Sequence, residues 1–325
     1  VVVNNVAPTA AATNNGVGVA GMDWQARIMP VRVLNEMGRG SLDVIADGVN
    51  WAYNHGAKVL NLSLGSTSDA QTLRLAVADA HAAGALVIAS MGNCRVQDQE
   101  CPVANPTNYP AAYDTVMAVA ATTRYDRYAY YSQRGSHCDI SAPGGDITLF
   151  AQDGIISTLP TYQDFYLRTH YGYARDYDYG QGTSLAAPYV AGLASLVWAA
   201  DPTLSPDQVR NIIQNTAEDL GTAGWDPDFG HGRVNALAAV QAVSVPLAPT
   251  LLPIDTDDGD YRVDWEPVAN AAGYVLEEDN HPAFPSPGER YRGAATWFQV
   301  SGQEPGAWYY RVRAYNDAGS GPWSN

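Results

Sequence analysis

The sequence predicts an α/β domain of three layers with a mostly parallel sheet, followed by a smaller β-sandwich. Between residues 24 and 245, short and continuously apolar segments alternate with segments of helical spacing. This pattern is typical of parallel strands that helices cover on both faces. The proline-rich stretch Val245–Pro253 cannot hold a helix and is expected to be either a linker between the domains or a first edge strand. Beyond it, apolar and polar residues alternate, as they do in half-buried antiparallel strands.

The first domain is predicted to comprise residues 1–245. Its continuously apolar segments are predicted as strands: Ala26–Leu34, Lys58–Ser63, Ala85–Ser90 and Thr115–Ala121. Its segments with helical spacing are predicted as helices: Ser41–Asn54, Asp69–Ala83, Ser184–Ala200, Ser205–Thr216 and Asn235–Val243. Ser41 is expected to cap the first helix, because its hydroxyl can accept a hydrogen bond from an amide of the first turn.

The second domain is predicted to comprise residues 246–325. Tyr261, Val263 and Trp265 share one face of a strand with period two, and further strands are expected at Tyr274–Leu276 and Trp308–Tyr315. Short strands of this kind, separated by turn residues, indicate a small β-sandwich.

Composition and charge restrict the function. Hydrophobic residues make up 46% of the 325 residues and charged residues 16%, which is typical of a globular protein. The formal net charge of −16 argues against nucleic acid as a partner, because phosphate binding needs a basic surface. No apolar run approaches the roughly 20 residues that span a bilayer, so no membrane partner is expected. An acidic, tyrosine-rich chain with a single lysine suits a secreted, extracellular protein.

The three cysteines do not form a zinc-binding pattern. Cys94 and Cys101 are close enough in sequence to close a small disulfide loop in an oxidising compartment. Cys138 is left over, and it is either buried or paired outside this chain.

The strongest chemical signal is the segment Gly182–Pro188, in which a turn of small residues leads into an apolar helix. Ser184 is therefore expected at a helix N-terminus, where the helix dipole and the first N–H groups favour developing negative charge. Pro188 falls in the first turn, where a missing N–H costs little. The alternative is an ordinary serine cap without chemistry.

Gly182–Pro188 closely resembles the nucleophile motif of the subtilisin family of serine proteases. Further segments resemble that family and occur in its order: Asn14–Val19, Gly38–Gly40, Asn61–Gly65, Ile88–Asn93, Asp139–Gly144 and Gly230–Asn235. The resemblance extends from about Asn14 to Val243.

The resemblance implies acyl transfer, in which Ser184 attacks a peptide carbonyl and an acyl-enzyme follows. The side-chain amide of Asn93 and the backbone N–H of Ser184 would stabilise the oxyanion. The alternative for Asn93 is a turn residue, since Gly-Asn pairs are common in loops.

The resemblance also implies a protein or peptide substrate that binds in extended conformation between two segments. The first segment is represented by Gly38, Gly40 and Leu42, and the second by Ser63, Leu64 and Gly65. A primary side-chain pocket would be lined by Ser90, Met91 and Gly92, although Met91 is bulkier than the small residues expected there.

A serine nucleophile of this kind needs a histidine base and an aspartate that orients it. The resemblance aligns the base with Val2 and places the aspartate before Val1. Among the histidines, only His170, in the tyrosine-rich insertion Thr161–Gly180, is expected to be mobile enough to substitute. Two interpretations follow, a protease fragment without its catalytic His and Asp, or a non-catalytic extracellular protein that binds peptides or acts as a scaffold. Either predicts at most a trace of peptide hydrolysis by the chain as written.

Calcium is the cofactor that the resemblance suggests, and no organic cofactor is expected. One candidate site combines the Asn15 side chain with the carbonyls of Thr13, Val17 and Val19. A second combines carbonyl groups with the Asp139 carboxylate, the carbonyls being those of Ala111, Tyr113 and Val116. Plain turns are the alternative at both. The glycines of Gly16–Gly21 match a dinucleotide fingerprint, but no strand precedes them, and nucleotide binding is rejected.

The tail resembles a fibronectin type III domain. The likeness is carried by Trp265–Pro267, Gly273–Glu277, Tyr309–Asn316 and Gly319–Ser324. Trp265 and Tyr310 are expected in its core, and a spacer or substrate-targeting role is expected for the domain. If exposed, Trp297, Trp308 or Trp323 could contact a carbohydrate or protein ligand.

Overall fold

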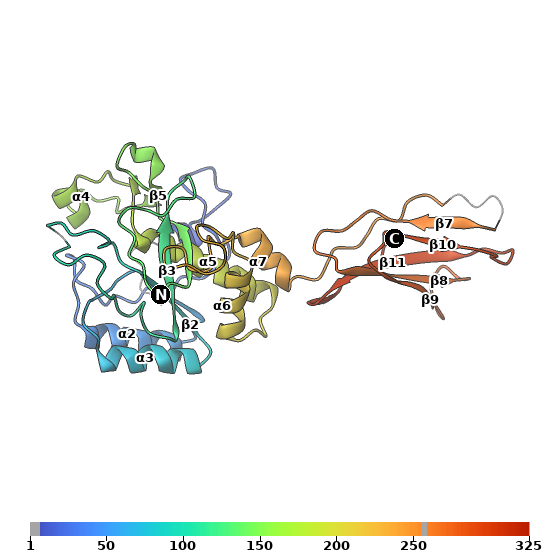
Figure 1. Ribbon diagram of the computed structural model, residues 1–325, viewed down its shortest axis with the longest axis horizontal. Helices are drawn as coiled ribbons and strands as arrows, with labels where there is room; N and C mark the ends of the chain where they lie inside the picture. Colours follow the sequence, from blue (N-terminus) through green and yellow to red (C-terminus); the bar gives the residue numbers. More distant parts are fainter. Residues whose placement is uncertain (1–6, 100, 255–258, 325) are drawn as a thin grey trace. The chain divides into compact units, whose positions relative to one another are not determined.

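The computed structural model describes residues 7–99, 101–254 and 259–324. The chain divides into two compact units, of which the first ends at Ala239 and the second begins at Val240 (Figure 1). The division falls inside helix α7 (Ala236–Val243), shortly before the proline-rich stretch.

The first unit is built on a parallel sheet. Its strands are β1 (Val59–Leu62), β2 (Leu86–Ser90), β3 (Val116–Thr122) and β4 (Ile140–Pro143), hydrogen-bonded in this order. Every residue of β2 and β3 is buried, because helices cover both faces of the sheet. The predicted parallel sheet is therefore confirmed, and β4 is a further strand that was not predicted from the sequence.

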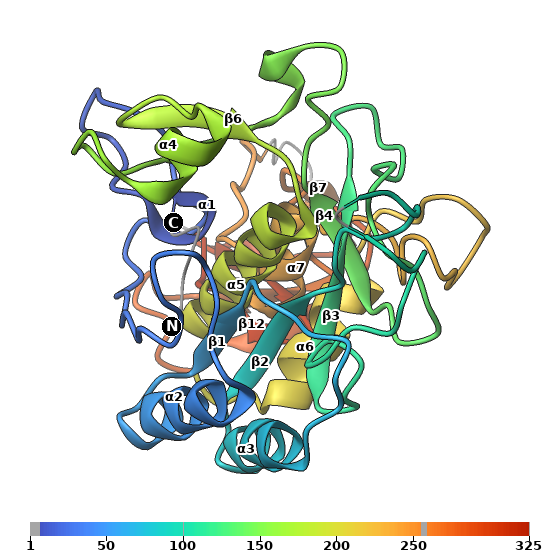
Figure 2. The same cartoon turned by 90° about the vertical axis from the view of Figure 1, so that its left-hand side faces the viewer.

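Helices α2 (Leu42–Asn54) and α3 (Gln71–Ala82) cover one face of this sheet and share its core cluster. The Ser41 hydroxyl caps α2 by accepting a hydrogen bond from the Val44 amide at 3.4 Å, as predicted. Helix α5 (Thr183–Ala200) contacts all four strands, with α6 (Pro206–Asn215) beside it (Figure 2). Since α5 contributes nothing to the α2–α3 cluster, it covers the opposite face.

Helix α5 is long and apolar enough, by length and composition, to cross a membrane. However, 67% of it is buried inside the protein. This burial is the pattern of a core helix, and it explains why α5 is apolar on nearly all sides.

The segment Ala26–Leu34 was predicted as a strand, and it belongs to no strand among the described residues. Val31 and Val33 instead pack on α2, where a Cβ added to Gly48 would lie 2.3 Å from Val33 Cγ1. The apolar pattern of this segment therefore reflects packing against a helix.

Smaller elements surround the sheet. Strands β5 (Ile155–Thr158) and β6 (Tyr177–Gly180) form an antiparallel pair, and the connection between them contains α4 (Tyr166–Tyr171). A short helix α1 (Ala7–Ala10) contacts α5, and a 3₁₀ turn η1 (Ala151–Asp153) precedes β5. Strand β6 runs towards the start of α5 and so leads into the segment that carries Ser184.

The second unit has two antiparallel sheets. Strands β7 (Tyr261–Asp264) and β10 (Trp297–Val300) form one. The other consists of β8 (Gly273–Asp279), β9 (Gly288–Gly293), β11 (Tyr309–Asn316) and β12 (Gly319–Ser320). Side chains from both sheets share one core, which contains Trp265 and Tyr310 as predicted.

The cysteines separate into a pair and a single buried thiol. Cys94 and Cys101 form a disulfide with an S–S distance of 2.04 Å, which confirms the predicted loop. Cys138 is buried in the first unit. Burial raises the pKa of the Cys138 thiol, so this residue lacks the thiolate character of a reactive cysteine.

Candidate active site

Ser184 is the second residue of α5 and is half-buried. The helix starts here because Gly182 is held in a conformation with φ 149° and ψ 153°, which side chains rarely adopt. The Gly182 amide donates to the Gly144 carbonyl at 3.0 Å and to the Tyr131 hydroxyl at 2.9 Å. The segment after β4 therefore fixes the residue from which the helix begins.

The side chain of Asn93 is held in one orientation by Thr183. Its Oδ1 accepts hydrogen bonds from the Thr183 backbone amide and hydroxyl, both at 2.9 Å. The Thr183 hydroxyl in turn accepts one from the Gly92 amide at 3.1 Å. Because the amide oxygen is fixed on the helix start, the amide nitrogen Nδ2 must point to the other side.

The position where a Cβ would stand on Gly182 reveals the geometry around Ser184. That point lies 3.0 Å from Ser184 Oγ, 3.3 Å from Asn93 Nδ2 and 3.7 Å from the Ser184 amide nitrogen. Ser184 Oγ and Asn93 Nδ2 therefore cannot be farther apart than the sum of the first two distances. The structure brings together the hydroxyl and both predicted oxyanion donors around one point that only glycine leaves open.

The segment after β1 is tied directly to this helix start. The Ser63 hydroxyl donates to the Ser184 carbonyl at 2.9 Å and accepts from the Asn61 side chain at 3.0 Å. Leu62 pairs with Ala89 in the sheet, so Ser63–Gly65 and Ser90–Gly92 follow neighbouring parallel strands at the same edge. Ligands of open α/β sheets bind at this carboxyl edge.

The other predicted substrate segment precedes α2. Gly38 and Gly40 are exposed, and the Asn35 side chain accepts hydrogen bonds from the amides of Met37 and Arg39 at 3.0 Å each. Leu42 is half-buried on the same core cluster as Leu64. The two segments therefore border one part of the core.

Met91 does not line a pocket, and this part of the prediction is wrong. The residue has no exposed surface and belongs to the core under α2 and α3, together with Val87 and Ala89. Alternate residues of a strand point to the same face, so Met91, directly after β2, continues the helix-facing row of Val87 and Ala89. The sequence analysis missed Asn108 and Gln133, whose side chains stand beside Gly65 and Gly92. No sequence pattern marked them.

The second candidate calcium site is also wrong. The Asp139 carboxylate is occupied by Arg210, whose Nη2 lies 2.6 Å from Oδ1, by Gln214 Nε2 at 2.8 Å and by the Ala118 amide at 2.7 Å. A carboxylate that already binds a guanidinium cation has no position left for a metal. With Asp139 so engaged, the carbonyls predicted with it, those of Ala111, Tyr113 and Val116, lack their only charged ligand.

The loop with Thr13, Asn15, Val17 and Val19 offers hard oxygen ligands only. Asn15 Oδ1 accepts a hydrogen bond from the Val17 amide at 3.0 Å, and the turn contains Asn14 and Gly16 at positive φ. The donor type fits calcium, while the number of ligands falls short of the six to eight that calcium takes.

The histidines make their described contacts away from Ser184. His170 stacks on Tyr166, and its Nδ1 lies 2.9 Å from the Thr169 hydroxyl, so its contacts are within α4. His81 pairs with Asp207 and His55 with the Trp51 carbonyl. Position 2, which the resemblance aligns with the base, lies outside the described residues.

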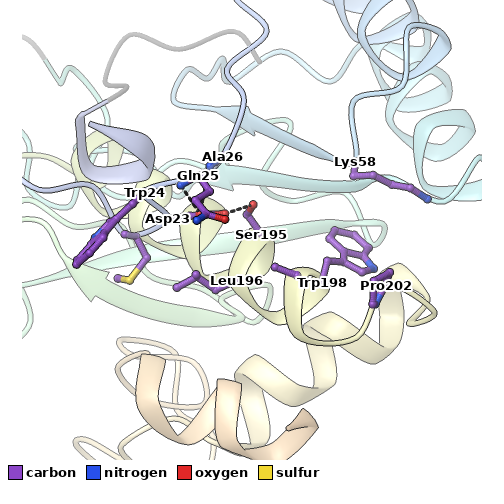
Figure 3. A pocket seen from close by; sticks show the side chains of 11 residues that line it. Asp23, Trp24, Gln25, Ala26, Lys58, Ser195, Leu196, Trp198 and Pro202 are labelled. Atoms are coloured by element: carbon purple, nitrogen blue, oxygen red, sulfur yellow. Dashed lines mark hydrogen bonds between the residues drawn. The ribbon is translucent and has the colours of Figure 1, made fainter. Parts of the chain in front are cut away.

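A pocket of about 660 Å³ lies elsewhere on α5, around Ser195 and Trp198 (Figure 3). Along the helix axis, Ser195 is roughly 16 Å from Ser184. The Asp23 carboxylate beside it accepts from the Ser195 hydroxyl at 2.6 Å and from the amides of Gln25 and Ala26. These partners saturate Asp23, so this pocket presents no reactive carboxylate.

A serine at a helix start, facing an oriented amide at the carboxyl edge of a parallel sheet, is the arrangement that an acyl-transfer enzyme with a serine nucleophile needs. The comparisons with known proteins then give the family. The model of the subtilase family matches residues 4–232, and the chain belongs to this family of serine peptidases.

Individual relatives agree with this assignment. Subtilisin BL of Lederbergia lenta is 40% identical over 239 residues, covering 73% of this chain and 76% of the relative. A thermostable alkaline protease of Halalkalibacterium halodurans is 38% identical, covering 73% and 57%. Among solved structures, a protease of Pseudoalteromonas arctica PAMC 21717 superposes with a TM-score of 0.62 at 36% identity, covering 73% of this chain and 69% of that one.

Proposed function

We propose that the first unit is a serine endopeptidase domain in which Ser184 is the nucleophile and proteins or peptides are the substrates. The observation that carries the proposal is the single point surrounded by Ser184 Oγ, Asn93 Nδ2 and the Ser184 amide. Oxyanion stabilisation requires donors that converge on the oxygen formed by the attack. This arrangement supplies two such donors beside the attacking atom.

In the proposed reaction, Ser184 Oγ adds to the carbonyl carbon of the peptide bond, and its proton passes to a general base. The resemblance aligns that base with Val2, which cannot accept a proton, so at most a trace of turnover is expected of the chain as written. The carbonyl oxygen becomes an oxyanion held by Asn93 Nδ2 and the Ser184 amide. Collapse breaks the C–N bond, the leaving amine takes up a proton, and the acyl group remains on Ser184 until water hydrolyses the ester. Thr183 keeps the Asn93 amide in the required orientation throughout.

The substrate is proposed to bind as an extended strand between the segments that contain Gly38–Leu42 and Ser63–Gly65. The two segments border the same core cluster through Leu42 and Leu64, and main-chain pairing gives affinity independent of sequence. The names of the relatives, which are proteases, support peptide substrates for this chain as well.

We also propose a calcium ion in the Thr13–Val19 loop, an extracellular location and a fibronectin type III-like sandwich for the tail. The loop offers oxygen ligands, the disulfide suits an oxidising compartment, and two antiparallel sheets share one core. The sandwich is proposed as residues 246–325, after a peptidase domain of residues 1–245. A rise in melting temperature with added calcium tests the first of these proposals; no rise at millimolar calcium contradicts it.

Exposed aromatic residues are the proposed ligand contacts of the tail. Trp297 is 43% exposed, with Arg262 over its ring at 4.8 Å. Trp308 and Trp323 are half-buried, and Trp323 stacks with Arg311 and Arg313. Trp297 is therefore the side chain that is best placed to contact a carbohydrate or protein.

A peptide boronic acid tests the proposed active site without relying on turnover. Its boron adds an alcohol and becomes a tetrahedral anion, which imitates the oxyanion intermediate. We expect the ¹¹B NMR signal of tetrahedral boron with the wild-type chain and no such signal with Ser184→Ala.

The outcomes separate the two interpretations of the chain. A tetrahedral signal that persists in Ser184→Ala contradicts the assignment of the nucleophile. If the chain binds the same peptide with a carboxylic acid in place of the boronic acid, but never forms the tetrahedral adduct, it is a non-catalytic peptide-binding protein. The peptidase proposal is then wrong.

A further inference from the structure

Two glycines beside the active site face buried amide side chains: both face Asn108, and Gly92 also faces Gln133. A Cβ on Gly65 would lie 2.2 Å from Asn108 Nδ2. A Cβ on Gly92 would lie 2.0 Å from Gln133 Oε1 and 3.2 Å from Asn108 Nδ2. Contacts of 2.0 and 2.2 Å are far inside van der Waals distance. Any side chain at either position would therefore displace these amides.

Asn108 is fixed in this place by its neighbours. The residue is 8% exposed, and its Nδ2 donates to the Ser90 carbonyl at 3.3 Å. The next residue, Tyr109, exchanges two backbone hydrogen bonds with Ser66, at 2.8 and 2.9 Å. Asn108 is therefore anchored both to the end of β2 and to the segment after β1.

Gln133 is fixed even more completely. It is 4% exposed, its Oε1 accepts from the Cys94 amide at 3.2 Å, and its Nε2 donates to the Pro106 carbonyl. Its backbone amide donates to the Gly92 carbonyl at 3.0 Å. Both ends of this amide are thus hydrogen-bonded, and moving it aside would break two partly buried hydrogen bonds.

In the proposed binding mode, a side chain of the bound peptide points towards these amides. The peptide is proposed to pair with Ser63–Gly65 and to place the carbonyl carbon of the cleaved bond at Ser184. The residue directly before that bond then directs its side chain towards Ser90–Gly92. Asn108 contacts the Cβ position of a glycine in each of these segments. Asn108 therefore reaches both segments, and Gln133 reaches the second.

We propose that Asn108 and Gln133 close the floor of the primary pocket, so that the enzyme prefers a small residue, such as alanine or serine, before the cleaved bond. This inference rests on the proposed function and specifies its substrate class. A large apolar side chain would have to displace two hydrogen-bonded amides and leave their buried partners unpaired, which is costly. A small side chain fits above the amides without disturbing them.

The test compares two peptide boronic acids that differ only in the residue attached to boron, acetyl-Ala-Ala-Pro-boroAla and acetyl-Ala-Ala-Pro-boroPhe. Wild type is expected to bind the alanine compound at least about tenfold more tightly, a ratio typical of pocket discrimination by size. In Asn108→Gly, the affinity for the phenylalanine compound should rise about tenfold or more, with little change for the alanine compound.

Thr107→Gly is the matched control, because it adds the same backbone freedom at the exposed neighbouring position and leaves the floor intact. Its affinity ratio should equal that of wild type. If Asn108→Gly does not fold, Asn108→Ala shortens the same side chain and carries the same comparison.

The results distinguish this inference from the proposed function. Equal or tighter binding of the phenylalanine compound by wild type overturns the small-residue preference, while the adduct itself leaves the proposed function standing. An unchanged ratio in both Asn108 variants overturns the role of Asn108. If neither compound yields tetrahedral boron, the proposed function fails, and this inference fails with it.

Discussion

Alanine at position 182 would place a methyl group where the oxyanion is proposed to form. The methyl carbon would lie 3.0 Å from Ser184 Oγ, 3.3 Å from Asn93 Nδ2 and 3.7 Å from the Ser184 amide nitrogen. An oxyanion must stand about 2.7–3.1 Å from its donors, so oxygen and methyl group compete for one space. The variant Gly182→Ala therefore tests the geometry without removing any functional group.

The expected loss follows from the donor that the methyl group crowds. In subtilisin itself, removing one side-chain donor costs about 10²–10³ in rate, and the methyl group would crowd the corresponding donor here, Asn93 Nδ2, at 3.3 Å. We therefore expect the affinity for a peptide boronic acid to fall at least about 100-fold. The φ of 149° at this position adds a backbone cost of about 1–3 kcal/mol to stability when the residue is not glycine.

The assay measures the dissociation constant of the boronic acid and the free energy of unfolding in urea for each variant. Gly172→Ala is the control, because Gly172 has a φ of 76° and nothing within 4 Å of its Cβ position. It should lose stability, about 1–2 kcal/mol, and keep its affinity. Equal affinity of Gly182→Ala and wild type would refute the proposed oxyanion position.

Three further predictions concern other parts of the chain. Tyr131→Phe removes the hydroxyl that donates towards the Gly144 carbonyl at 2.8 Å and accepts from the Gly182 amide. It should lower the free energy of unfolding by about 1–3 kcal/mol and weaken boronic acid binding. Unchanged binding contradicts a role of Tyr131 in positioning the start of α5. Burial lowers the pKa of His137 below its usual value of about 6.5, so its contribution to stability is complete above that pH and is lost as the pH falls through it towards the folded-state pKa. Urea unfolding at pH 7.5 and 5.5 should show that the free energy of unfolding falls less in His137→Gln than in wild type. An equal fall in both proteins refutes the assignment. Trp265→Ala empties a core position that is 2% exposed and should destabilise the second unit by about 3–5 kcal/mol. Calorimetry should show a lower melting temperature for the transition of the second unit only. A lower melting temperature for both transitions contradicts independent cores.

The parts of the fold that were predictable are those whose sequence pattern has a single physical cause. The continuous apolar runs at β1, β2 and β3 predicted strands buried on both faces, which the structure confirms, and Ser41 was predicted to cap the helix that follows it. The segment 26–34 has the same apolar character, yet it packs on α2. Composition alone does not distinguish a strand buried by pairing from an extended segment buried by a helix.

The site was predictable where it depends on a short motif and not where it depends on distant contacts. Ser184 and Asn93 belong to motifs, and the structure brings them together. Met91 was misplaced because strand alternation beyond the end of β2 decides which way it points. Asp139 was misassigned to a metal because its partner Arg210 is 71 residues away in sequence, and Asn108 was missed for the same reason.

The most direct measurement is a crystal structure of the chain with a bound peptide boronic acid. The proposed function predicts a covalent bond from boron to Ser184 Oγ, with one boron oxygen within about 3.1 Å of both Asn93 Nδ2 and the Ser184 amide nitrogen. Boron bonded to another residue, or an oxygen that points to solvent away from Asn93, would contradict the account.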